Sequence, residues 1–257
     1  MMRRYFFECS YNGGAFYGWQ IQPKQISVQE TIQKYMTRLN SNQPVVIVGC
    51  GRTDAGVHAH SSIFHIDFDR EIDLSEWIYK LNKMLPTTIS IKEGYEVTLD
   101  DHARFTAKKR TYRYFIHKTK TPFKHAYSTL YPYPLDFEAM NIAASFLIGT
   151  HDFTTFSKAN TDVKTHICEV FGAKWIQVNE EEAYFEYTAN RFLRNMVRAT
   201  VGTLYEVGLG KITPSEFKEI LQSQDRTKCG GSAAAQGLFL WKVEYLTEIK
   251  FFPQRHF

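Results

Sequence analysis

A single carboxylate, Asp54, lies in a glycine-rich stretch of this chain, residues 49–59, which reads GCGRTDAGVHA. An apolar run, residues 45–48, precedes it. Glycine permits sharp bends and allows another molecule to approach the backbone closely. A carboxylate on such a bend could act as a nucleophile or as a base. Because burial alone raises a carboxyl pKa, this chemistry requires a cation that keeps the group ionised.

Two nucleotide-binding motifs do not fit the glycines. A dinucleotide fingerprint, GxGxxG, would begin at Gly49, but Asp54 stands at its third glycine and would repel a pyrophosphate. The stretch 202–212 resembles a P-loop only faintly. Tyr205 replaces its first glycine and Ile212 replaces the Ser or Thr that binds magnesium.

Three histidines, His58, His60 and His65, follow the bend. On a strand the first two share a face and the third points the other way, and no thiolate or carboxylate completes a set of ligands. We therefore expect no metal site and no cofactor.

The segment Thr-Asp-Ala-Gly at 53–56 also resembles the Asp-Thr/Ser-Gly loop of aspartic hydrolases. That chemistry needs two carboxylates that share one proton. Asp152 is the one comparable loop carboxylate in the sequence, and its neighbours differ. We therefore expect Asp54 to act alone, and absence of peptide cleavage at low pH would exclude the hydrolase.

Cations gather in two runs although the net charge is only +4. The sequence also contains 15 tyrosines and 20 phenylalanines, several of them beside these cations. Basic residues interleaved with aromatic ones are typical of a nucleic-acid surface, and the alternative is a solvated charged face over an aromatic core. The cations of the two runs are Lys108, Lys109, Arg110, Arg113, Lys118, Arg191, Arg194 and Arg198.

The composition indicates a soluble globular protein, with 44% hydrophobic and 23% charged residues among 257. Four cysteines without a CxxC pair are typical of reduced thiols in a cytoplasmic protein. Glu8 interrupts the short apolar run at the N-terminus, so we expect no signal peptide. No apolar run is long enough to span a bilayer.

The first part of the chain predicts the order β-α-β-β-α-β, which is a ferredoxin-like unit. Ser27 and Glu30 form a capping box at the start of the first helix, and Pro86 ends the second. The expected elements are strands over 3–11, 45–50, 61–68 and 88–97, a helix from residue 27, and a helix over 74–84.

The second part predicts the same plan less regularly. Strands are expected over 111–117, 167–178, 183–189 and 238–246, and helices over 137–147, 191–207 and 214–222. The best boundary is 99–109, so we expect domains 1–104 and 105–257. The predicted fold is α+β, with two ferredoxin-like units whose antiparallel sheets pack side by side and share a cleft.

The predicted helix 191–207 would carry an arginine stripe. At about 100° per residue, Arg191, Arg194 and Arg198 fall on one narrow face, opposite an apolar stripe. Such a face is typical either of a solvated surface or of a contact with RNA.

Several motifs together resemble the TruA-type tRNA pseudouridine synthase family. Residues 51–59, GRTDAGVHA, resemble its signature, and the resemblance covers almost the whole chain in the expected order. The other matching segments are 11–20 (YNGGAFYGWQ), 27–29 (SVQ), 81–86 (LNKMLP), 110–114 (RTYRY), 151–156 (HDFTTF), 192–198 (FLRNMVR) and 237–240 (GLFL).

The resemblance implies roles for named residues. Asp54 would be the catalytic nucleophile or base, Arg198 would lie beside it as the required cation, and Tyr112 would stack on the uracil and guide a proton. Arg52 lies on the same side of an extended segment as Asp54 and could bind a phosphate or replace the extruded base, unless it braces the loop in an ion pair. Thr53 and His58 are expected to brace the bend.

The resemblance also implies a reaction and a substrate. Uracil leaves its ribose, turns and rejoins through carbon, at uridines 38 to 40 in the anticodon arm of tRNA, and the family works as a homodimer in the cytoplasm. A uridine inside a stem must be flipped out first, and Arg110, Arg191 and Arg194 are expected to contact the RNA backbone.

Three positions depart from the family pattern. Asn12 replaces the usual Asp, His166 replaces a common Arg, and Ala234 replaces the usual Pro. Of these, His166 puts one RNA contact in question. The competing hypothesis is a non-catalytic RNA-binding protein built from two RRM-like units, which the absence of an RNP-type aromatic string disfavours.

Overall fold

The computed structural model of the chain describes residues 1–158 and 163–245. Its fold is mixed α and β, which confirms the predicted class. The described residues form two compact units, the first from 1–108 together with 240–245, and the second from 109–239. The prediction assigned all of 105–257 to the second domain, whereas the last strand packs with the first unit.

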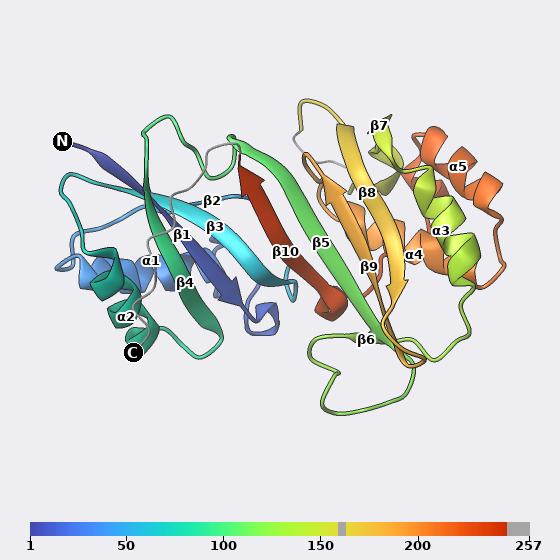
Figure 1. The fold of residues 1–257 in the computed structure, drawn as a ribbon, viewed down its shortest axis with the longest axis horizontal. Coiled ribbons are helices and arrows are strands. Elements are labelled where there is room, and N and C mark those ends of the chain that lie inside the picture. Colours follow the sequence, from blue (N-terminus) through green and yellow to red (C-terminus); the bar gives the residue numbers. More distant parts are fainter. Residues whose placement is uncertain (159–162, 246–257) are drawn as a thin grey trace. The chain divides into compact units, whose positions relative to one another are not determined.

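The first unit contains one sheet and two helices (Figure 1). The strand order is β4-β1-β3-β10, and β2 also pairs with β3. The central strand β1 runs antiparallel to both β3 and β4. The elements are β1 (Arg3–Tyr11), α1 (Val28–Leu39), β2 (Val48–Gly49), β3 (His58–Phe68), α2 (Leu74–Met84), β4 (Ile89–Val97) and β10 (Leu238–Tyr245).

Side chains on one face of this sheet form the core with the two helices. Phe7 and Phe64 are fully buried, and their rings stack with centroids 5.5 Å apart. Helix α1 begins where the Ser27 hydroxyl accepts a hydrogen bond from Glu30 N, which confirms the predicted N-cap. An N-cap of this kind stabilises a helix by about 1 kcal/mol.

The strand predicted over 45–50 is wrong for most of its length, because β2 covers only Val48–Gly49. The backbone before it pairs with side chains of α1 instead of with a strand. Val45 N donates to the Thr37 hydroxyl, and Ile47 N donates to the Gln33 side-chain oxygen. The apolar run that suggested a strand therefore packs beside a helix for most of its length.

The second unit contains a sheet with the order β5-β9-β8-β7, and β6 pairs with β5 (Figure 1). The sequence did not indicate β6 or β7, which are only two and four residues long. The elements are β5 (Ala107–His117), β6 (Thr129–Leu130), α3 (Phe137–Ser145), β7 (Gly149–Asp152), β8 (Ile167–Gln177), β9 (Glu182–Ala189), α4 (Met196–Gly208) and α5 (Pro214–Gln222). The prediction for the last strand included Leu246, which lies outside the described residues.

The helix predicted over 191–207 starts five residues late, because α4 begins at Met196. Asn195 adopts φ 67°, a left-handed conformation that an α-helix cannot contain. Arg191 and Arg194 therefore lie in the connection from β9 to α4. The prediction that they share a helix face with Arg198 is wrong.

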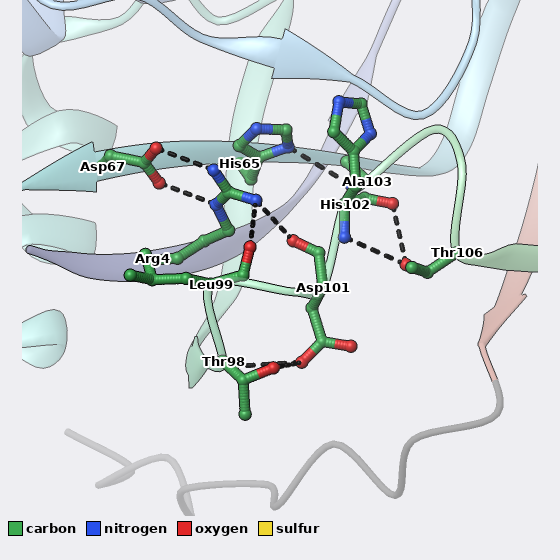
Figure 2. A network of polar contacts seen from close by, with 9 residues as sticks. All are labelled: Arg4, His65, Asp67, Thr98, Leu99, Asp101, His102, Ala103 and Thr106. Atoms are coloured by element: carbon green, nitrogen blue, oxygen red, sulfur yellow. Dashed lines mark hydrogen bonds and ion pairs between the residues drawn. The ribbon is translucent and has the colours of Figure 1, made fainter.

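A polar network in the first unit fixes the segment that follows β4 (Figure 2). The Arg4 guanidinium binds the Asp67 carboxylate and also donates to the carbonyls of Leu99 and Asp101. Ala103 N donates to Nδ1 of His65, which is 4% exposed. The segment is therefore held against β1 and β3 by several hydrogen bonds, of which the one to His65 is buried.

This network predicts a pH dependence of stability. Burial lowers the pKa of His65 from 6.5 to about 4, with Arg4 and His102 adding to the shift and Asp67 opposing it. Because the unfolded chain takes up this proton near pH 6.5 and the folded chain only near pH 4, the free energy of unfolding should fall as the pH drops through that window. The expected loss is on the order of 1 to 3 kcal/mol.

Urea unfolding between pH 7 and pH 4 measures this effect. His65→Asn keeps a hydrogen-bond acceptor but does not titrate, so its stability should depend less on pH. If the free energy of unfolding changed equally with pH in His65→Asn and in the parent chain, His65 would not be the group responsible.

Candidate active site

The Asp54 carboxylate lies on a turn between β2 and β3 of the first unit. Val57 N donates to Asp54 O at 3.1 Å, and Gly56 adopts φ 76°. Asp54 is half-buried, and Arg52 is exposed. The glycine at 56 is thus required by the backbone conformation, as the sequence predicted.

The segment 11–19 packs against this turn and is hydrogen-bonded to it. The hydroxyls of Tyr11 and Thr53 are hydrogen-bonded at 2.9 Å, and Gly13 N donates to His58 Nδ1 at 3.1 Å. Trp19 N donates to Thr53 O. These contacts support the bracing role expected of Thr53 and His58.

Two glycines of this segment cannot carry a side chain. A Cβ at Gly13 would lie 2.0 Å from Val57 O, and one at Gly18 would lie 2.5 Å from Thr53 O. The two backbones are therefore in direct contact on both sides of Asp54. Such packing fixes the backbone on both sides of Asp54, and reactions through a nucleophile or a base require a well-positioned group.

In the second unit, Tyr112 lies on β5 opposite Tyr187 of β9. Tyr112 is half-buried, and its ring meets Phe192 edge to face at 4.9 Å. Phe192 also contacts the Tyr187 ring at 5.0 Å. The sequence gave no role to Phe192, which packs the connection before α4 against Tyr112.

Arg198 lies in the first turn of α4 and is held by the segment 229–235. Its Nε donates to Ala233 O at 2.6 Å, and Ala233 N donates back to Arg198 O at 2.9 Å. Gly230 N donates to the Thr203 hydroxyl. The guanidinium is therefore anchored through Nε.

A glycine contact makes this anchoring possible. A Cβ at Gly202 would lie 1.7 Å from Gly231 O, so α4 and the segment 229–235 touch through their backbones. Sequence reasoning missed this contact. The pair Gly230-Gly231 was its signal, because adjacent glycines often mark a close approach of backbones.

Gly202→Ala is expected to destabilise the protein although alanine normally favours a helix. The added methyl group clashes with a backbone atom that hydrogen bonds hold in place, so the free energy of unfolding should fall by about 3 kcal/mol. Thermal unfolding measures the change. Gly172→Ala is the matched control, since nothing lies within 4 Å of a Cβ there, and equal losses in both variants would contradict the clash.

The three expected RNA contacts gather around the connection from β9 to α4. Arg110 donates through Nη1 to Asn190 O at 2.7 Å. Arg194 is exposed, and its carbonyl accepts a hydrogen bond from Lys158 N. Arg191 is close enough to Cys168 to oppose the rise that burial causes in the pKa of that thiol, which reaches about 11.

The structure thus groups Arg52 with Asp54 in the first unit. It groups Arg110, Arg191 and Arg194 near Tyr112 in the second, with Arg198 on the helix that follows. Among residues 1–158 and 163–245, no cluster of His, Cys, Asp or Glu is placed to bind a metal ion. In the same part of the chain no helix is long and apolar enough to cross a membrane.

Proteins of known family match this chain over nearly its whole length. A family model described as tRNA pseudouridine synthase matches residues 143–246. A tRNA pseudouridine synthase A from Bacteroides fragilis is 46% identical over 249 residues, which cover 96% of this chain and 98% of that protein. The proteins of the same name from Parabacteroides distasonis and Bacillus subtilis are 47% and 39% identical, over 96% and 92% of this chain and 98% and 96% of their own lengths.

These matches define the class of protein. The chain belongs to the tRNA pseudouridine synthase family, as its motifs indicated, and its relatives in that family are of the TruA type.

Proposed function

We propose that this protein is an isomerase that converts uridine to pseudouridine in the anticodon arm of tRNA, at uridines 38 to 40. The observation that carries the proposal is 46% identity to a tRNA pseudouridine synthase A over 96% of the chain. Within the stretch 51–59, Asp54 lies on a turn that two backbone contacts hold in place.

The reaction breaks the bond between uracil N1 and the ribose C1′ and forms a bond between uracil C5 and C1′. The proton lost from C5 is balanced by the proton gained at N1, so neither water nor a cofactor is consumed. A positioned carboxylate is sufficient for such an exchange. In this proposal Asp54 is that carboxylate, attacking the sugar or the base.

The other site residues act on the same uridine. Arg198 supplies the cation that keeps Asp54 ionised, and its Nε contact with Ala233 O supports a fixed position for this charge. Tyr112 stacks on the uracil, and its half-buried ring against Phe192 suits that role. Arg52 is exposed and takes the place of the flipped base or binds a phosphate.

Contacts with the RNA backbone offset the cost of flipping the base. Arg110, Arg191 and Arg194 are the proposed contacts, and their position around one connection supports a common surface. Such contacts read the shape of the folded RNA more than its sequence.

The finer fold and assembly are also part of the proposal. Each unit is a variant of the ferredoxin-like arrangement, supported by the orders β4-β1-β3 and β5-β9-β8 and the helices that accompany them. The protein works as a homodimer in the cytoplasm. Light scattering of the purified chain measures the assembly.

Incubation of the protein with an unmodified tRNA transcript tests the activity. Mapping of pseudouridine should find it within the anticodon arm, with no added metal or cofactor. If the protein binds tRNA but leaves every uridine unchanged, it is the non-catalytic RNA-binding protein of the competing hypothesis. Modification confined to another arm would refute the proposed substrate site.

A further inference from the structure

One aromatic side chain of the first unit, Phe105, is exposed although its backbone is tightly held. Its exposed fraction is 73%. Single exposed apolar residues are common on protein surfaces and need no explanation by themselves. Phe105 differs because of the turn that carries it, residues 102–106.

Each backbone N–H of this turn donates a hydrogen bond, and Figure 2 shows the contacts of His102, Ala103 and Thr106. Ala103 N donates to the buried His65 ring, and Ala103 O accepts from the Tyr245 hydroxyl at 2.6 Å. His102 N donates to the Thr106 hydroxyl, which donates back to His102 O. The turn is therefore pre-organised, and binding through it costs little conformational entropy.

The ring of Phe105 has an aromatic neighbour and a cationic one. The His102 ring lies 4.3 Å away, and its Nδ1 accepts hydrogen bonds from the backbone of both Arg104 and Phe105. The Arg104 guanidinium lies 5.5 Å from the Phe105 ring centroid. Unpaired nucleobases stack on aromatic rings and on guanidinium planes, and this turn presents an aromatic ring with a guanidinium over it.

The charges around the turn favour a polyanion. Arg104 and Lys108 are exposed, whereas the Asp101 carboxylate is engaged by the backbone and hydroxyl of Thr98. Asp100 is the exposed acid of this segment. The apolar surface offered by Phe105 and Leu99 is far smaller than the roughly 800 Å² per partner that a stable protein interface buries.

We propose that Phe105 is a stacking platform for an unpaired base of the tRNA substrate, with Arg104 facing the adjacent phosphate. This inference rests on the proposed function, since it takes tRNA as the ligand. It assigns a binding role to a turn that lies outside the motif around Asp54. The platform contributes to affinity and leaves the chemical step to the site residues.

The test measures binding of an unmodified tRNA transcript in the Asp54→Asn background, so that turnover does not interfere. Phe105→Ala should raise Kd about 10-fold, Phe105→Leu nearly as much, and Phe105→Tyr little, because stacking needs a π face. Tyr79→Ala is the matched control. Tyr79 is a 60% exposed aromatic residue of α2 with the Lys83 ammonium 5.6 Å from its ring centroid.

Each other outcome overturns the inference. An unchanged Kd for Phe105→Ala removes the platform, and an equal loss for Tyr79→Ala shows that any exposed aromatic residue has the same effect. If Phe105→Ala lowers the molar mass measured by light scattering and leaves Kd unchanged, the ring contacts a second copy of the chain instead of tRNA. Failure of the proposed function is separate, because it appears as absent pseudouridine in the parent chain whatever the binding results.

Discussion

Asp54→Asn is expected to lower turnover on tRNA by on the order of 10³-fold or more, with tRNA affinity close to that of the parent chain. Asparagine has the shape of aspartate and accepts similar hydrogen bonds, so the turn held by Gly13, Gly18 and Tyr11 should remain. The amide carries no negative charge and can neither attack carbon nor take a proton. Single-turnover kinetics and equilibrium binding of a tRNA transcript measure the two quantities.

Asp152→Asn is the matched control for this change. Asp152 is also a half-buried carboxylate, at the end of β7, but its oxygen accepts hydrogen bonds from the backbone and hydroxyl of Thr154, which an asparagine oxygen can still accept. Turnover should therefore persist in this variant. If Asp54→Asn kept full turnover, Asp54 would not be the catalytic group, and comparable losses in both variants would make the effect non-specific.

Arg198→Ala is expected to reduce kcat by about 100-fold, which is the usual cost of removing one fixed group that stabilises charge in an active site. The apparent KM should change little, because the proposed role concerns the chemical step. Arg198→Lys should not restore kcat, since the lysine ammonium carries its donors and its charge on one nitrogen and cannot hold the Ala233 carbonyl while placing that charge where the guanidinium lies. Steady-state kinetics with a tRNA transcript separate the two parameters.

Arg191→Ala and Arg194→Ala provide the comparison. Both residues precede α4, and their proposed contacts are with RNA phosphates, so their loss should raise KM and weaken the salt dependence of binding. Equal reductions of kcat in Arg191→Ala and Arg198→Ala would refute this division of roles.

Local signals account for the elements that the sequence predicted well. Helix α2 has the predicted bounds, since Asp73 caps its first turn and Pro86 follows its end. Helix α5 is also as predicted, with Thr213 and Glu216 forming a capping box next to Pro214. These features depend on neighbours in the sequence, so that a single chain is enough to find them.

Errors arose where distant contacts decide the structure. The apolar periodicity of 191–207 continued through Asn195, whose left-handed backbone prevents the helix from beginning before Met196. In most of the strand predicted over 45–50, the backbone instead donates hydrogen bonds to side chains of α1. For the site, motif resemblance identified the residues, but it did not reveal the backbone contacts at Gly13 and Gly202 that position two of them.

The division of the chain has a consequence for its synthesis. The first unit begins with residue 1 but obtains β10, a neighbour of β3, only after 109–239 have been made. Until then the eleven-residue strand β3 lacks this neighbour, and an unpaired strand edge invites association with other chains. A fragment that stops before Leu238 should therefore aggregate more than the full chain during expression.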